Sequence, residues 1–197
     1  MRKPTDNKKE ATKKTAPAKK PKTKPISQEI ADEDEALAPF IGALFRGIVD
    51  ADDRQIVIVC FGTTAIAGDS FGPMVGSALR DKYAVPAFVY GTEEHCVNGK
   101  NMGEWIEFIK TVHEGAVFIA VDASLGAGEK VGRIILRTDG VCPAAIKGKT
   151  TRFGDVGILG VVAQSSSDPL MQLLSVSPLY VQEMADKVAD MLYSALA

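Results

Sequence analysis

The strongest constraint on the fold is a continuous apolar run followed by a glycine-rich loop and a helix. Residues 55–61 read QIVIVCF, without alternation of polar and apolar side chains, which is typical of a strand buried on both faces. The loop GTTAIAGDS follows, and Gly72–Tyr83 is predicted to be a helix, with Pro73 in the first turn where its missing N–H costs little. This order predicts a parallel sheet that helices cover.

The alternation of strands and helices continues along the chain. Only about ten residues separate the predicted third and fourth strands, which is short for a parallel crossover, so the fourth strand should have an antiparallel neighbour. Together, the segments predict a three-layer α/β/α sandwich with a mixed, mainly parallel sheet, formed by a single domain over residues 26–197. The further strands are predicted at Ala87–Tyr90, Ala116–Val121, Gly132–Arg137 and Val156–Ala163, and the further helices at Met102–Val112 and Val181–Leu196.

Two local features complete the expected fold. Ser27 is a plausible N-cap, and the apolar spacing after it predicts a helix over residues 27–49 that packs on the sheet. His113 lies at the polar end of a predicted helix, where a protonated imidazole would interact favourably with the helix dipole.

The first 25 residues differ from the rest in charge and composition. They hold ten lysines and arginines against two acids, and almost no large apolar side chain. Such a segment cannot bury enough surface to offset the entropy of ordering, so we expect a disordered, solubilising or tethering tail. Its lysines could also make weak contacts with nucleic acid, and DNA binding that weakens steeply with salt and is lost on deleting residues 1–25 would support this alternative.

The chain is expected to be cytoplasmic, with no role for a membrane. The tail lacks the apolar core of a signal peptide, and no segment has about 18 uninterrupted apolar residues, the length that a membrane-spanning helix needs. Three cysteines, Cys60, Cys96 and Cys142, form no CxxC pair, which argues against a disulfide scaffold and for a reducing compartment.

Several common catalytic and nucleotide-binding signatures are absent. Gly62, Gly68 and Gly72 are too widely spaced for the GxGxxG dinucleotide turn, and a P-loop ending at Lys149 would need glycine where Pro143 stands. No GxSxG nucleophile elbow is present. Neighbouring side chains generally point in different directions, so the run Glu93–Cys96 is better read as a polar loop that faces a substrate than as a nucleophile pair or a metal site.

Two aspartates remain as catalytic candidates. Asp69 lies between the first buried strand and its helix, and Asp122 follows the apolar segment at 116–121. Asp69 could instead cap the helix, and Asp122 could be a turn residue. Parallel sheets place ligand sites at the carboxyl ends of their strands, so the two acids could share one pocket. Two such carboxyls cannot both ionise easily, and the pair could hold a water between an acid and a base.

At these residues the chain resembles the YyaC-type family of sporulation proteins, which are related to the germination protease of endospore-forming bacteria. The resemblance covers roughly Gln55 to the C-terminus. It rests on the core Gly-Asp-Ser-x-Gly-Pro at Gly68–Pro73, the loop VYGTEEHCVNGKNM with His95 and Asn98, and VDASLG at Asp122. It implies an aspartate-dependent peptidase in which Asp69 and Asp122 act.

More distantly, the hydrogenase-maturation proteases share this fold and contact a metal through acids at the same two positions. They also use a histidine in the segment between the fourth and fifth strands. The corresponding segment here, TDGVCPAAIKGKTTRFGDV, contains no histidine. We therefore expect no metal and no cofactor.

The sequence thus predicts a sporulation-associated peptidase, located in the cytoplasm of the spore or sporulating cell. Asp69 and Asp122 would activate water, and the partner would be a protein or peptide substrate. Two alternatives stay open: a non-catalytic spore protein that binds peptide, or DNA through its tail, and a metal-dependent maturation-type protease. The expected substrate-binding residues are Gly62, Thr63, Gly68, Ser70, His95 and Asn98.

Overall fold

The computed structural model describes residues 27–30, 54–143 and 151–196. Within these residues, six strands form one sheet in the order β1-β5-β6-β4-β2-β3. The strands are β1 (Ser27–Ile30), β2 (Ile56–Cys60), β3 (Phe88–Tyr90), β4 (Val117–Gly126), β5 (Ile134–Arg137) and β6 (Val156–Gln164). The helices are α2 (Phe71–Ser77) with its π-helical continuation η2 (Ala78–Tyr83), α3 (Met102–Val112), α4 (Pro169–Ser175) and α5 (Pro178–Leu196), and the short 3₁₀ turns are η1 (Gly68–Ser70) and η3 (Gly128–Lys130).

The sheet is mixed and mainly parallel, as the sequence predicts. β3, β2, β4 and β6 run parallel to their neighbours in that order, whereas β5 pairs antiparallel with both β6 and β1. The connection from β4 to β5, which contains η3, is too short to cross back to the end of the sheet where a parallel strand would begin. This accounts for the antiparallel direction of β5.

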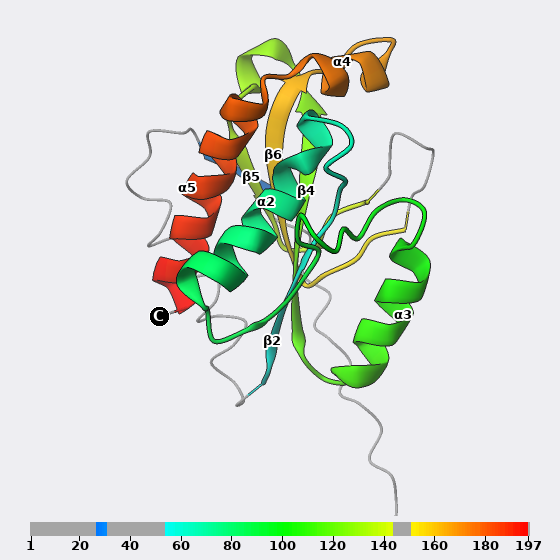
Figure 1. Ribbon diagram of the computed structural model, residues 1–197, viewed down its shortest axis with the longest axis vertical. Coiled ribbons are helices and arrows are strands. Elements are labelled where there is room, and N and C mark those ends of the chain that lie inside the picture. The colour runs from blue at the N-terminus through cyan, green and yellow to red at the C-terminus, as the bar shows by residue number, and fades with distance from the viewer. Residues whose placement is uncertain (1–26, 31–53, 144–150, 197) are drawn as a thin grey trace, which may run out of the picture.

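Helices cover both faces of this sheet, so the molecule has three layers (Figure 1). Successive side chains of a strand point to opposite faces, so β2 contributes side chains to the apolar core on each face of the sheet. Ile58 and Cys60 belong to the core under α2 and α5, while Val57 and Val59 belong to the core under α3. Burial on both faces explains why residues 55–61 show no polar alternation.

The connections after β2 and after β3 run in opposite directions across the sheet. The chain passes from β2 through α2 to β3 on one side of β2, and then through α3 to β4 on the other side. The loop after β2 and the end of β4 therefore border a topological switch point, where the strand order reverses. Open α/β sheets bind their ligands in the crevice at such a point.

Three expectations need correction. Ser27 does not cap a helix but begins β1, because Ser27–Ile30 pair with Ile134–Arg137 of β5. β4 does not end before Asp122 but continues to Gly126, since its pairing with β6 extends that far. His113 does follow the last residue of α3, but it is buried rather than solvated, and its ring bonds Tyr90 Oη at 2.8 Å and Gln55 Oε1 at 3.0 Å.

Other expectations fall outside the described residues. The tail of residues 1–25 and the rest of the helix predicted up to residue 49 lie there, so the division into tail and domain stays a prediction. Among the helices that the structure describes, none has both the length and the apolar character needed to cross a membrane.

Candidate functional site

Asp69 is held by a tight main-chain contact in the loop between β2 and α2. Gly62 has a φ of +138°, and a Cβ atom there would overlap the main-chain oxygen of Asp69. Thr63 N–H donates to that same oxygen at 3.1 Å. Glycine is needed at residue 62 because only glycine adopts this φ readily and lets the loop return so closely. Ser70, and not Asp69, occupies the N-cap position of α2, so the alternative reading of Asp69 as the cap of this helix does not hold.

Asp122 is held by β4 itself. The pairing of β4 with β2 ends at Val121, opposite Cys60, so Asp122 is the first residue of β4 beyond that pairing. On its other side Asp122 lies opposite Leu159 of β6. Asp122 is 8% exposed, which is unusual for an acid and excludes the reading of Asp122 as a surface turn residue.

The environment of Asp122 favours its neutral form. Burial raises the pKa of Asp122 well above that of an ordinary carboxyl, and the negative charge of Asp69 raises it further. A hydrogen bond from the main chain of Ala123 opposes this only in part. Asp122 is therefore protonated at a pH where a solvated aspartate is ionised.

The two acids lie near each other, since the charge of Asp69 acts on Asp122. η1, which carries Asp69, packs against β4, which carries Asp122, at the switch point of the sheet. Asp69 is partly exposed and Asp122 is buried. Such a difference in environment suits the exposed carboxyl to act as a base and the buried one to act as an acid. This arrangement is suited to placing a water between a carboxylate and a carboxylic acid.

Three further candidates have packing roles in the same loop. A Cβ atom at Gly68 would lie 2.8 Å from Leu173 Cδ2 of α4, so this glycine allows α4 to approach. The Ser70 hydroxyl is buried and donates to the main-chain oxygen of Ala67 at 2.6 Å. Thr63 Oγ1 accepts from Ala65 N–H at 3.3 Å. These contacts shape the loop that carries Asp69, and direct substrate contact by Gly62, Thr63, Gly68 and Ser70 stays a prediction.

His95 and Asn98 lie in the loop after β3. The His95 side chain is 66% exposed and its Nδ1 lies 3.6 Å from Glu94 Oε2, so it is available to a ligand at the surface. The Asn98 carboxamide accepts from Lys100 N–H at 3.0 Å, and its main-chain oxygen accepts from Met102 N–H at 2.8 Å. Asn98 thus organises the start of α3. This loop contacts the loop between β2 and α2, because Gly62 N–H donates to the main-chain oxygen of Val97.

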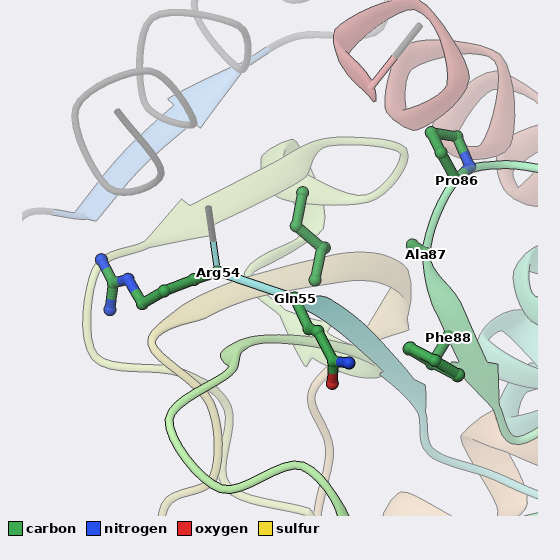
Figure 2. Close-up of a pocket in the computed structure, with 6 residues that line it drawn as sticks. Arg54, Gln55, Pro86, Ala87 and Phe88 are labelled. Atoms are coloured by element: carbon green, nitrogen blue, oxygen red, sulfur yellow. The ribbon is translucent and has the colours of Figure 1, made fainter. Parts of the chain in front are cut away.

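The cavity drawn in Figure 2 lies elsewhere. It encloses about 310 Å³ where β2 and β3 begin, whereas the two acids lie beyond the carboxyl end of β2. It is lined by Arg54, Gln55, Ile56, Pro86, Ala87 and Phe88. This cavity is therefore not part of the candidate site.

Asp69 and Asp122 are the acids at this site that could contact a metal ion. Among the residues that the structure describes, no three His, Cys, Asp or Glu side chains are grouped as metal ligands. Two carboxylates alone supply fewer protein ligands than catalytic zinc sites use. Within residues 54–143 and 151–196, the two aspartates therefore do not by themselves make up the ligand set of such a site.

Comparisons with known proteins agree with this fold. A family model described as "Protein of unknown function (DUF1256)" matches residues 29–191. The uncharacterized protein YyaC of Bacillus subtilis (strain 168) is 31% identical over 167 residues, which is 84% of this chain and 82% of that protein. The [NiFe] hydrogenase maturation protease HycI from Thermococcus kodakarensis KOD1 superposes with a TM-score of 0.50 at 19% identity, over 80% of this chain and 98% of that one. This last likeness shows a shared α/β fold.

Proposed function

This chain belongs to the DUF1256 family. From the arrangement of its two acids, we propose that it is a peptidase in which Asp69 and Asp122 act together on a water molecule. One observation supports this most: a buried aspartate with a raised pKa lies at the switch point of the sheet, within the electrostatic influence of a second aspartate. Structural carboxyls are normally paired with a cation or exposed to water. Asp122 is buried, and no cation is among the groups that shift its pKa.

The reaction follows from the two protonation states. The Asp69 carboxylate accepts a proton from the water as the water oxygen attacks the carbonyl carbon of a peptide bond. Asp122, which is protonated, donates its proton to the carbonyl oxygen. When the tetrahedral intermediate collapses, the C–N bond breaks, the amine leaves with the proton that Asp69 accepted, and Asp122 recovers its own proton. The buried position of Asp122 strengthens each of these interactions because little water surrounds it.

The activity can be tested on the proteins of the source organism. Extracts are incubated with the full chain, and new amino termini are labelled and identified by mass spectrometry. We expect wild type to create new termini and Asp69→Asn to lose about 10²–10⁴-fold in rate, the usual contribution of a general base. Glu107→Gln, a change of an exposed acid on α3, is the matched control and should retain full activity. Absence of new termini with wild type, or full activity of Asp69→Asn, would contradict the proposal.

We further propose that this peptidase acts in the cytoplasm of the spore or sporulating cell. The support is the resemblance to the YyaC type and the germination protease, carried by Gly68–Pro73 and by the segment around Asp122. The same experiment addresses this when extracts of sporulating and of vegetative cells are compared. Substrates found equally in both would argue against a role in sporulation.

A further inference from the structure

Large apolar side chains are exposed together on α4 and on the first turn of α5. Leu170, Met171 and Leu174 of α4 are 49%, 53% and 48% exposed, and Leu179 of α5 is 68% exposed. Residues 170, 171 and 174 share one side of a helix, whereas Leu173 points inward and is buried. We refer to Leu170, Met171, Leu174 and Leu179 as the α4 patch. Soluble proteins seldom expose such clusters without a partner.

The α4 patch adjoins the candidate site. The inward side of α4 packs on η1, and Leu173 lies against Gly68, the residue before Asp69. α4 also contacts β6, the strand next to β4. Figure 1 shows α4 across the end of the sheet where β4 and β6 finish, beside the beginning of α2. A ligand bound on the α4 patch would thus lie on the element that covers the loop carrying Asp69.

Charge and chemistry indicate which ligand this surface suits. Residues 164–179 contain no lysine or arginine, and their polar residues are mainly serine and glutamine. This segment itself therefore supplies no cation for the phosphates of nucleic acid or of anionic lipid. Leucine and methionine side chains adapt to apolar partners of varied shape. The chemistry thus favours an apolar segment of a polypeptide.

We propose that the α4 patch binds apolar side chains of the polypeptide that Asp69 and Asp122 cleave, and so determines which substrates this peptidase accepts. This inference rests on the proposed function. The apolar residues of the substrate lie on α4, and the bond to be cleaved extends from there toward Asp69 on η1. The surface contributes binding and contributes no group to the chemical step.

The test uses synthetic peptides that span cleavage sites identified in the extract experiment, each paired with a copy whose apolar residues are replaced by serine. We expect Met171→Ser and Leu174→Ser to raise the KM for the apolar peptides about tenfold each and to leave kcat unchanged. The serine copies should bind poorly to wild type. Phe108→Ser is the matched control, because Phe108 is 50% exposed on α3, on the other face of the sheet.

A second measurement separates binding from catalysis and from folding. A fluorescein-labelled apolar peptide should bind the inactive Asp122→Asn chain, and adding Met171→Ser should weaken that binding about tenfold without changing the melting temperature. Cleavage with an unchanged KM in the patch variants would overturn this inference alone. Absence of cleavage by wild type would overturn the proposed function itself. Self-association of the chain that Met171→Ser abolishes would assign the patch to a second copy and would also contradict the inference.

Discussion

Asp122→Asn is expected to abolish peptide cleavage and at the same time to stabilise the fold. The activity should fall by about 10²–10⁴-fold, because asparagine cannot donate a proton to the carbonyl oxygen of the peptide bond as water attacks. The stability gain has a definite pH dependence. An acid whose pKa is raised in the folded state stabilises the fold most at low pH, and this contribution is lost as pH rises from the ordinary carboxyl pKa toward the raised one.

Asparagine has no such titration, so the advantage of the variant should grow with pH. The free energy of unfolding of Asp122→Asn relative to wild type should increase by about 1.4 kcal/mol for each pH unit in that window. For a domain of this size, each kcal/mol raises the melting temperature by roughly 2–4 °C. Chemical denaturation at several pH values measures the effect, with Glu107→Gln as the control that should follow wild type. A variant that is less stable than wild type at every pH would show that Asp122 has a structural role.

Gly62→Ala is expected to damage both the fold and the activity. An alanine Cβ would overlap the main-chain oxygen of Asp69, and φ at this residue is +138°. The loop must move or strain, so we expect a loss of roughly 2–4 kcal/mol in the free energy of unfolding. Displacing Asp69 by about 1 Å is enough to cost about 10²-fold in rate.

Gly103→Ala is the matched control for this prediction. Gly103 lies in the first turn of α3, and a Cβ atom there would meet nothing within 4 Å. Alanine is the better helix former, so this variant should be as stable as wild type or up to about 1 kcal/mol more stable. Melting curves and cleavage rates of both variants are compared under the same conditions. Equal stability and activity of Gly62→Ala and wild type would show that the close approach of residue 62 to the Asp69 main-chain oxygen is not needed.

The elements predicted correctly from the sequence are those set by local patterns. β2 follows from an uninterrupted apolar run, and α3 coincides with the predicted Met102–Val112, where apolar residues recur at helical spacing. β5 has the antiparallel neighbour that the short connection requires. The likeness in fold to a hydrogenase maturation protease confirms the predicted α/β class.

The errors arose where a distant partner decides the conformation. Ser27–Ile30 have a helical pattern with the residues after them, but they become a strand by pairing with residues 134–137, over a hundred positions away. Asp122 and the small residues after it read as a turn, but they remain extended because β6 pairs with them to Gly126. His113 reads as polar in isolation, yet Tyr90 and Gln55 come together around its ring only in the folded sheet.

The candidate site was predictable in part. The acids at residues 69 and 122 are visible because they follow strands, but the burial of Asp122 depends on both neighbouring strands and on η1, which no local pattern describes. α4 was missed, although Asp168 followed by Pro169 is a helix start signal. In the structure Asp168 Oδ1 accepts from Met171 N–H, as this signal indicates. A helix that begins at that pair places Leu170, Met171 and Leu174 on one side, whereas their exposure and the contact of α4 with η1 follow only from the tertiary structure.

The central claim is that Asp69 and Asp122 act as one coupled pair, and the titration of Asp122 tests it most directly. The side-chain carboxyl carbon of Asp122 is followed by NMR from acidic to alkaline pH in wild type and in Asp69→Asn. In wild type the apparent pKa should lie well above that of an ordinary aspartate, and in Asp69→Asn it should fall, because one cause of the shift has been removed. An ordinary pKa in wild type, or a pKa that Asp69→Asn leaves unchanged, would contradict the coupled pair and the mechanism built on it.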